Sequence, residues 1–299
     1  MNIKRKLSKL FRCGLTAMSP RMNTKIVYLN KFHRRVNLKN PTKLNDKILW
    51  LKFNDYYNNE LVKQCADKYK VRDYIKKKGC GEILNELISV YDNADIVDWN
   101  NMPNSCAIKL NIGCGCNHIV TDLENEDKDA LYSEIKTWFR TAPEYYLGYA
   151  EMQYKDVKPY LIVEKYLGGP NGELPIDYKF YCMNGKVQLI MMCTNRDEHG
   201  HGAQFYYMDR DWNLKVGYVD DDIDIEKPNM LQKAIEYAEA LSADFPFVRV
   251  DFYLFEDSVI FGELSFTPAA GMDVDHNRIV DGTNQSIDDY YGRILKINS

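Results

Sequence analysis

The chain has 299 residues, of which 45% are hydrophobic and 13% aromatic, so it can bury the core of two domains or of one elaborate domain. No apolar run approaches the roughly 18 to 20 residues of a membrane-crossing helix, and no apolar stretch ending in small residues marks a cleaved export signal at the N-terminus. The eight cysteines are scattered, which in such a chain indicates reduced thiols. These features argue against an integral membrane protein and a disulfide-stapled secreted domain, and they predict a cytoplasmic protein.

Charge is unevenly distributed. Residues 1–40 contain eleven Lys or Arg and no Asp or Glu, and because the whole chain carries −4, the remainder carries −15. Ile3, Leu7, Leu10 and Phe11 are spaced along one helical face. The pattern predicts a basic amphipathic helix on an anionic membrane surface or an acidic partner, and a solvated arm is the alternative. The acidic remainder argues against nucleic acid as the partner.

Hydrophobic periodicity and turn residues predict the following elements. They are, in chain order, helices over 41–53 and 60–79, a strand pair at 106–111 and 118–122, a helix over 128–141, strands over 159–167, 177–183 and 186–194, a helix over 229–243, and strands over 245–255 and 258–268. Asn184-Gly185, between two apolar runs, is a strong hairpin signal. The predicted class is α+β with largely antiparallel sheets.

The last predicted hairpin gathers carboxylates. Strand alternation puts Arg249, Asp251 and Tyr253 on one face, and Glu263 shares a face with Ser265 on the partner strand. Adjacent strands would place Asp251 beside Glu263, where two carboxylates repel unless a cation lies between them. Mg²⁺ suits two carboxylates completed by substrate phosphates, and Arg249 would contact those phosphates as a forked donor. A surface ion pair on an exposed sheet is the alternative.

A glycine-rich loop follows a lysine in "AIKLNIGCGCNHIV". Gly113 and Gly115 would let backbone N–H groups turn towards an anion, and Lys109 would add a positive charge. The spacing fits neither a Walker loop nor a dinucleotide fingerprint. A phosphate-binding loop and an ordinary hairpin turn are both compatible with this pattern.

The same loop contains possible metal or redox ligands. Cys114, Cys116 and His118 form a C-x-C-x-H pattern, which is tighter than the usual zinc spacing. No second pair with ligand spacing is evident, so zinc or redox chemistry is the weaker interpretation.

Taken in order, five segments resemble the ATP-grasp superfamily. They are "ADKYKVRDYIKKKG", "AIKLNIGCGCN", "IVEKYLGGPNGE", "VRVDFY" and "FGELSFTPAAGM". Within it, "KLNDKILWLKF", "DYKFYCMNGK" and "FPFVRVDFY" resemble the teichuronopeptide-biosynthesis (TupA-like) branch, over about residues 40–285. The resemblance implies an ATP-grasp fold, in which two α+β subdomains with largely antiparallel sheets grip ATP between them. It also favours phosphate binding by the glycine loop.

The resemblance implies a set of ligands for ATP and Mg²⁺. The implied nucleotide contacts are Lys68, Lys109, Gly113, Gly115, Glu164, Lys165, Tyr166, Leu167 and Glu173. The implied metal ligands are Asp251, Glu263 and Ser265, the last of which stands where the family usually has Asn. A hydroxyl is a poorer metal ligand than an amide carbonyl, so a second metal is less firmly implied.

Two further segments are candidates for catalysis. Lys179 shares a strand face with Asp177, and we expect it, with Arg249, to contact phosphate. In the polar stretch "TNRDEHGHGAQFYY", Arg196 would hold a substrate carboxylate and His199 or His201 would handle a proton, whereas a surface loop is the alternative.

The domain organisation that we expect is a basic N-terminal arm over 1–40, a helical part over 41–100, a lid subdomain over 101–167 and a metal- and ATP-binding subdomain over 168–299. Family chemistry implies an ATP-dependent carboxylate–amine ligase that joins an amino acid or amine to a sugar acid of a surface polysaccharide or its precursor. The alternatives are a kinase, a glycosyltransferase and a nucleotide-binding scaffold. Residues 1–40 would give a peripheral contact with the inner face of the membrane.

Overall fold

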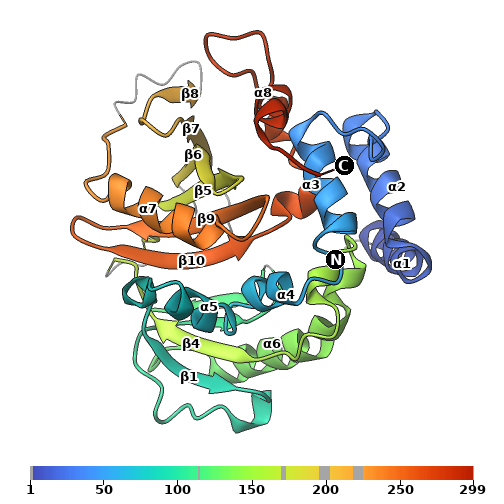
Figure 1. Ribbon diagram of the computed structural model, residues 1–299. Coiled ribbons are helices and arrows are strands. Elements are labelled where there is room, and N and C mark those ends of the chain that lie inside the picture. The colour runs from blue at the N-terminus through green and yellow to red at the C-terminus, as the bar shows by residue number, and fades with distance from the viewer. Residues whose placement is uncertain (1–2, 114, 170–172, 195–202, 218–224, 299) are drawn as a thin grey trace.

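The structure is a computed structural model that describes residues 3–113, 115–169, 173–194, 203–217 and 225–298. This part of the chain forms two β-sheets that lie one above the other in Figure 1, with the N-terminal helices beside both. All the strand pairs of both sheets are antiparallel. The predicted α+β class with largely antiparallel sheets is confirmed.

The larger sheet has the strand order β10-β9-β5-β6-β7-β8. Its strands are β5 (Asp177–Met183), β6 (Lys186–Thr194), β7 (Gln204–Met208), β8 (Leu214–Val216), β9 (Phe247–Leu254) and β10 (Val259–Ser265). Helix α7 (Leu231–Ser242) packs against β5, β6 and β9 and covers one face with buried apolar side chains. The β5–β6 turn confirms the predicted hairpin, since Asn184 and Gly185 both have positive φ, at 53° and 76°.

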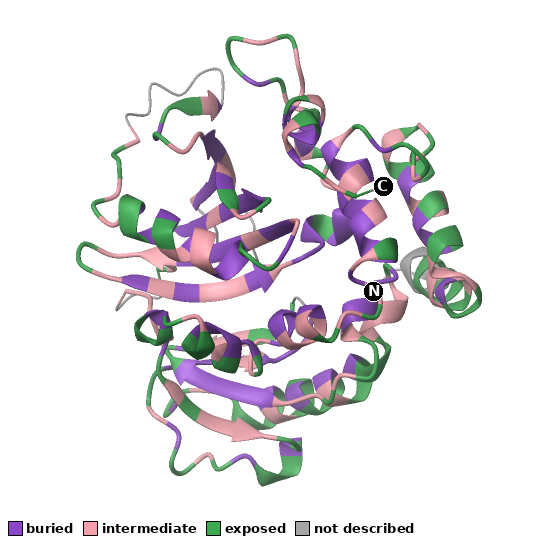
Figure 2. Ribbon diagram, in the orientation of Figure 1, coloured by how far each residue is buried: buried purple, intermediate pink, exposed green. Residues whose placement is uncertain are grey.

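The smaller sheet has the strand order β1-β4-β2-β3. Its strands are β1 (Leu87–Tyr91), β2 (Cys106–Leu110), β3 (Asn117–Val120) and β4 (Leu161–Lys165). Helix α6 (Lys128–Thr141) buries Leu131, Ile135 and Trp138 in the same apolar cluster as β2 and β4. The predicted strand pair around the glycine loop and the helix over 128–141 are therefore confirmed. Strand β4 is almost wholly buried, as its colour in Figure 2 shows.

The helix predicted over 60–79 is interrupted. The structure has α4 (Glu60–Ala66) and α5 (Val71–Lys77) instead of one helix. Between them Asp67 has an extended backbone, and its Oδ1 accepts the N–H groups of Tyr69 and Lys70 at 2.8 and 3.1 Å. A carboxylate that captures these two donors competes with helix continuation. The single-helix prediction was wrong for this reason, and the break gives Lys68 its position.

Asn111 fixes this break to the glycine loop. Its fully buried side chain donates to Asp67 Oδ2 at 2.8 Å and accepts the N–H of Tyr160 at 2.8 Å. Its carbonyl also accepts the N–H of Lys68 at 2.9 Å. One side chain thus ties the α4–α5 break to β2 and to the segment that leads into β4.

Much of the basic N-terminal segment is folded onto the protein. It forms α1 (Ile3–Met18) and α2 (Pro20–Phe32), beside α3 (Leu44–Asn54) in Figure 1. The buried Tyr28 donates to Asp46 at 2.6 Å, and Arg34 donates to Asp46 and to Asp288 of α8 (Ile287–Ile294). The predicted helix at the start of the chain is confirmed, but the second half of the segment is not a solvated arm.

Several elements carry no clear pattern in the sequence. Helices α2 and α8 and strands β1, β7 and β8 were not predicted, and α3 begins at Leu44 rather than at Pro41. The three strands have five residues or fewer, and β1 and β8 lie at sheet edges with partly exposed side chains. Pairing with a neighbouring strand, rather than local hydrophobic alternation, decides such short strands.

Asn111→Ala should destabilise the protein by about 2 to 3 kcal/mol, because it removes partners from the buried Asp67 carboxylate and from the N–H of Tyr160. The measurement is the midpoint of urea unfolding. Asn101→Ala is a matched control, since Asn101 is exposed and donates to the nearby Asp98. Equal midpoints for the two variants would contradict a structural role of Asn111.

Candidate functional site

A polar cavity of about 290 Å³ lies between the two sheets. Its walls come from β5, β9 and β10 of the larger sheet, from β2, β4 and the glycine loop of the smaller sheet, and from the α4–α5 region. Eight of the site residues predicted from the sequence line it, namely Lys68, Lys109, Gly113, Gly115, Glu164, Lys179, Asp251 and Glu263. Residues scattered over almost 200 positions of sequence therefore face one space.

The β9–β10 hairpin places the two carboxylates side by side, as strand alternation predicts. Asp251 is opposite Glu263, and Arg249 is opposite Ser265. The Arg249 guanidinium donates to both oxygens of Asp251 at 2.7 and 2.6 Å, to Glu263 at 3.3 Å and to Ser265 at 3.2 Å. The hydroxyl of Ser265 donates to Glu263 at 2.9 Å. Arg249 thus lies between the carboxylates and partly neutralises both of them.

A second cation reaches the same carboxylate from the neighbouring strand. Lys179 on β5 is paired in register with Asp251 on β9, and its Nζ lies 2.9 Å from Asp251 Oδ2. Lys179 also donates to Asp177 on its own strand face. The predicted sharing of a face by Asp177 and Lys179 is confirmed, and both line the cavity.

Neighbouring charges keep Glu263 and Arg249 ionised. Burial disfavours the charged form of Glu263, but Lys68, Arg249 and Lys179 outweigh it and lower the Glu263 pKa to about 2. Burial likewise opposes the charge on Arg249, whereas Asp251 raises the Arg249 pKa well above its ordinary value. Glu263 is therefore ionised at neutral pH, whereas burial raises the pKa of Asp251 and its neighbours Arg249 and Lys179 oppose that rise.

These residues fit a hard divalent cation. Asp251 and Glu263 supply adjacent carboxylate oxygens on one sheet face, and Ser265 supplies a hydroxyl beside them. Within the described residues, no group of three or more His, Cys, Asp and Glu side chains is arranged to hold a metal. Two carboxylates with ligands completed by phosphate oxygens and water suit Mg²⁺ rather than a metal that needs a full protein cage.

Glu164 lies in the opposite wall, held by two cations. Lys109 Nζ donates to one of its oxygens at 3.0 Å, and Arg72 donates to the other at 3.2 Å. Burial opposes the charge on Lys109, but Glu164 and further acidic groups raise the Lys109 pKa. Arg72 was not among the predicted site residues, although it lies on α5, four positions after Lys68, in the same quoted segment. The spacing within that segment was the signal that would have found it.

Lys68 connects the glycine loop with the β9–β10 hairpin. Its Nζ donates to the carbonyl of Gly113 at 2.6 Å and lies 3.6 Å from Glu263. Gly113 has φ of +76°, and a Cβ there would lie 2.6 Å from the ring of Tyr145. A side chain at position 113 is thus excluded both by backbone conformation and by contact. Gly115 also has positive φ but faces open space.

The other predicted nucleotide contacts do not line the cavity. Lys165 is bonded through its backbone to residues 85 and 86, and the Tyr166 hydroxyl donates to the carbonyls of Gly169 and Glu173. Leu167 is partly exposed next to them. These residues, with Glu173, form a loop at the end of β4, beside the cavity wall that contains Glu164.

Some predicted residues lie outside the described part of the chain. They are Arg196, with the neighbouring histidines at 199 and 201, and Cys114. Of the possible zinc pattern, Cys116 lines the cavity, whereas His118 contacts Glu126 at 3.2 Å and Glu134 at 3.8 Å. The described members of the pattern therefore have separate environments.

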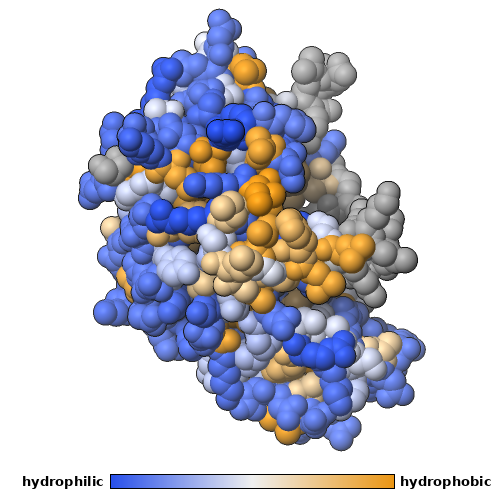
Figure 3. Space-filling view, turned by 90° about the vertical axis from the view of Figure 1, so that its right-hand side faces the viewer, coloured by the Kyte–Doolittle hydropathy of each residue, from blue (hydrophilic) through white to orange (hydrophobic). Residues whose placement is uncertain are grey.

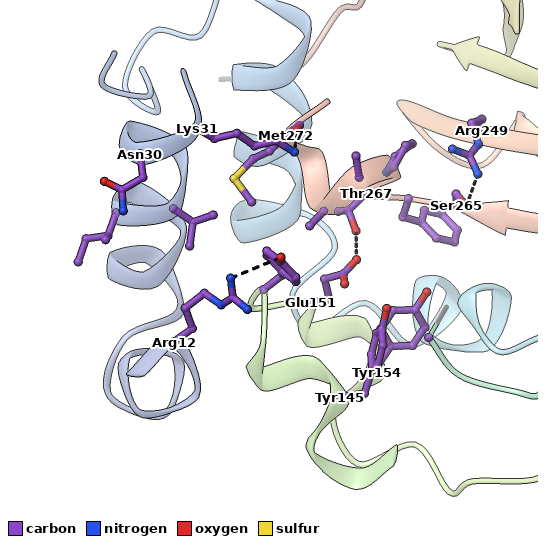
Figure 4. A pocket seen from close by; sticks show the side chains of 18 of the residues that line it. Arg12, Asn30, Lys31, Tyr145, Glu151, Tyr154, Arg249, Ser265, Thr267 and Met272 are labelled. Carbon is purple, nitrogen blue, oxygen red and sulfur yellow. Dashed lines mark hydrogen bonds between the residues drawn. The ribbon is translucent and has the colours of Figure 1, made fainter. Parts of the chain in front are cut away.

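A second cavity, of about 690 Å³, adjoins the first and shares Gly113 and Glu263 with it. Figure 4 shows Arg12, Asn30 and Lys31 from the N-terminal helices on one side, and Arg249 and Ser265 on the opposite side. The floor and the remaining wall are formed by aromatic side chains and by the segment from Phe266 to Ala270. Sequence patterns did not indicate this cavity, because one wall comes from α1, α2 and residues 145–154, which lie outside the five ATP-grasp-like segments.

A buried carboxylate faces this second cavity. Glu151 accepts a hydrogen bond from Thr267 at 2.9 Å, and Gln153 donates to the same hydroxyl. Burial raises the Glu151 pKa, although Lys52 lowers it. Lys52 is itself buried, and its Nζ donates hydrogen bonds to the carbonyls of Tyr149 and Ala270. Burial lowers the pKa of Lys52 to about 8. Glu151 is therefore a candidate for binding a positively charged group.

Comparison with known proteins identifies the family. The profile of the TupA-like ATP-grasp proteins matches residues 46–288. No curated protein sequence gives a significant match. Among solved structures, D-alanine–D-alanine ligase from Bacillus anthracis is 18% identical with a TM-score of 0.43, and the match covers 70% of this chain and 59% of that one.

Two other ATP-grasp structures are similarly distant. The ligase PsnB complexed with a minimal precursor is 13% identical with a TM-score of 0.42, over 80% of this chain and 62% of its own. The ADP complex of PurK, an N5-carboxyaminoimidazole ribonucleotide synthetase, is 13% identical with a TM-score of 0.42, over 74% of this chain and 50% of its own. The match thus spans between half and two thirds of the length of these proteins. With its two antiparallel sheets around a polar cavity and the family profile over most of its length, the chain belongs to the TupA-like family and has the ATP-grasp fold.

Proposed function

We propose that the protein is an ATP-dependent carboxylate–amine ligase that acts through an acyl phosphate. The observation that carries the proposal is the cavity between the sheets, where cations face two adjacent carboxylates. Lys68, Lys109 and Lys179 line this cavity with the carboxylates Asp251 and Glu263, and Arg249, which lines the adjoining larger cavity, donates to both carboxylates. This combination suits a polyphosphate with a divalent cation, because the cations contact phosphate oxygens while the carboxylates hold the metal.

ATP would lie with its phosphates between the glycine loop and the β9–β10 hairpin. Lys68 and Lys109 approach from the smaller sheet, and Lys179 and Arg249 from the larger one. Asp251 and Glu263, with Ser265 beside them, would hold Mg²⁺, which when bound neutralises developing phosphate charge. Glu164 and the loop over 165–169 and 173, at the opposite end, would receive the adenine and ribose. Arg196 and the histidines near it remain candidates for the acceptor side.

The chemistry takes place in two steps. A carboxylate oxygen attacks the γ-phosphorus, the bond to the β,γ-bridging oxygen breaks, and ADP leaves. An amine nitrogen then attacks the acyl carbon and loses a proton, and phosphate leaves with the carbon–oxygen bond electrons. The residues of this chain position the reactants and stabilise negative charge, which is the main demand of phosphoryl transfer.

The larger cavity would hold the acceptor and the amine. It adjoins the phosphate end through Gly113 and Glu263, and its walls contain Arg12 and Lys31 for an anionic acceptor. Glu151 would bind the incoming ammonium group. We propose a sugar acid of a cell-surface polysaccharide, or of its precursor, as the acceptor and an amino acid or amine as the donor. The TupA-like family assignment supports this substrate class. ATP as substrate also favours a cytoplasmic location.

We predict that Mg·ATP will stabilise the wild-type protein and that Asp251→Asn will abolish this effect. Ligand at a hundred times its Kd adds about 2.7 kcal/mol to the free energy of unfolding. That gain raises the Tm of a chain of this size by a few degrees. The measurement is the Tm with and without Mg·ATP. Asp257→Asn is a matched control, because Asp257 is exposed at the turn of the same hairpin.

Lys109→Ala provides a second variant on the other sheet, in case Asp251→Asn fails to fold. It should lose the same stabilisation while keeping the circular dichroism spectrum of the wild type. If Mg·ATP stabilised both variants as much as the wild type, the proposal that this cavity binds the nucleotide would be wrong.

Product analysis should show ADP and free phosphate in equal amounts when hexuronic acids and amino acids are supplied together. A kinase would leave the phosphate on the sugar, a glycosyltransferase would not consume ATP, and a scaffold would bind ATP without turnover. The assay measures ADP, free phosphate and the mass of the acceptor. Phosphate found on the acceptor in the absence and presence of amine would overturn the ligase proposal.

Glu151→Gln should raise the KM for the amine about ten- to a hundredfold, because a charged hydrogen bond contributes roughly 1.5 to 3 kcal/mol. Gln preserves an acceptor for the hydroxyl of Thr267, so stabilisation by Mg·ATP should be unchanged. Glu144→Gln, at an exposed position before the aromatic wall, is the control. An unchanged KM for the amine in Glu151→Gln would exclude this role.

A further inference from the structure

The N-terminal helices leave a row of apolar side chains exposed. Six of the fourteen large apolar residues exposed in the described part of the chain lie on α1 and α2. They are Leu7, Leu10, Phe11, Met18, Met22 and Leu29. The four on α1 recur at helical spacing, and Leu7 and Leu10 are 61% and 68% exposed. We call these six residues the N-terminal apolar face.

This face forms a patch on the surface. Figure 3 views the side of the molecule on which Figure 1 places α1 and α2, and apolar side chains gather there within a largely hydrophilic surface. The opposite side of α1 is packed, since Thr16 is buried and Asn23 of α2 donates to it at 2.6 Å. Helix α1 therefore has its position fixed by the protein while its apolar side chains point to solvent.

Charge within the segment that carries the face has a single sign. Among residues 7–40, eight are Lys or Arg and none is Asp or Glu. Lys9 and Lys25 are exposed on α1 and α2 themselves. An apolar stripe with basic flanks, on a helix lying at the surface, is typical of a helix that inserts its apolar side into the headgroup region of an anionic bilayer. None of the described helices could span a membrane, so the contact would be peripheral.

A second copy of the chain fits this face less well. A symmetric dimer would press the same patch against itself and so bring the basic flanks of both copies together. With no acid among residues 7–40 to compensate them, these charges would repel. An anionic lipid surface satisfies both the apolar stripe and the positive charge.

The face also adjoins the large cavity. Ser8, Phe11 and Arg12 of α1 line that cavity, and Phe11 belongs to the face as well. Contact of α1 with a bilayer would thus bring the cavity next to the lipid surface. Helix α1 thus carries both exposed apolar side chains and part of the cavity lining. It lies outside the matched family region of residues 46–288.

We propose that the N-terminal apolar face is a docking surface for an anionic phospholipid membrane, which it binds through α1 and the start of α2. The inference rests on the exposed side chains and the charge, and it does not depend on the proposed ligase chemistry.

The test is co-sedimentation of the full chain with vesicles of phosphatidylcholine containing about one third phosphatidylglycerol. The wild type should bind at low salt, bind far less at high salt because the Lys and Arg contacts are screened, and not bind vesicles of phosphatidylcholine alone. Leu7→Asp combined with Leu10→Asp should weaken binding at least tenfold. Neither residue lines either of the two cavities described above.

Ile96→Asp is the matched control, because Ile96 is 56% exposed and lies on a short helix near α6, away from the N-terminal face. It should bind vesicles like the wild type. Lys9→Glu with Lys25→Glu should reproduce the loss caused by the leucine substitutions. Stabilisation by Mg·ATP is measured in every variant and should stay unchanged, which separates a failure of docking from a failure of the nucleotide site.

Three results would overturn the proposal. One is no binding of the wild type to anionic vesicles at low salt. Another is equal binding by the wild type and the double leucine variant. The third is a wild-type dimer in sedimentation velocity that the leucine substitutions convert to a monomer, which would make the face a contact between copies.

Discussion

Asp251 and Glu263 lie opposite each other on adjacent strands, and this pair of charges determines the arrangement around it. Two neighbouring carboxylates repel, so each requires cations close by. The fold supplies them from different segments: Arg249 from the same strand as Asp251, Lys179 from the next strand, and Lys68 from the break between α4 and α5. The cluster therefore holds three parts of the chain in register and leaves a charged surface in the cavity between the two sheets.

A carboxylate is also paired with nearby cations on the opposite side of the cavity. Glu164 in the smaller sheet is held by Lys109 and Arg72, so each sheet presents an acidic group with its own cations. Lys68 bridges the two sides, since it bonds to Gly113 of the loop and approaches Glu263 of the hairpin. The break that positions Lys68 depends in turn on Asp67 and Asn111. The buried side-chain amide of Asn111 thus stabilises the α4–α5 break, and the break positions Lys68 in the cavity.

Sequence patterns identified much of this site because its residues occupy regular elements. Alternation along two strands placed Asp251 beside Glu263, and the Asn-Gly turn and the glycine loop were recognisable from local chemistry. The prediction of one helix over 60–79 failed because helical periodicity does not reveal that Asp67 captures two backbone N–H groups. Arg72 was missed although its spacing from Lys68 was a usable signal, and Glu151 was missed because its contact with Thr267 joins residues far apart in sequence.

The sequence by itself determined the α+β class, the antiparallel hairpins, the family resemblance and the charged face of the β9–β10 hairpin, because each depends on patterns of a few residues. Only the tertiary structure decided which cations reach which carboxylates, that the second half of the basic segment packs onto the protein, and that a second cavity opens beside Glu263. Those properties depend on how the two sheets and the N-terminal helices pack together. Contacts between distant segments are set by the packing of the whole chain, and local patterns contain no record of them.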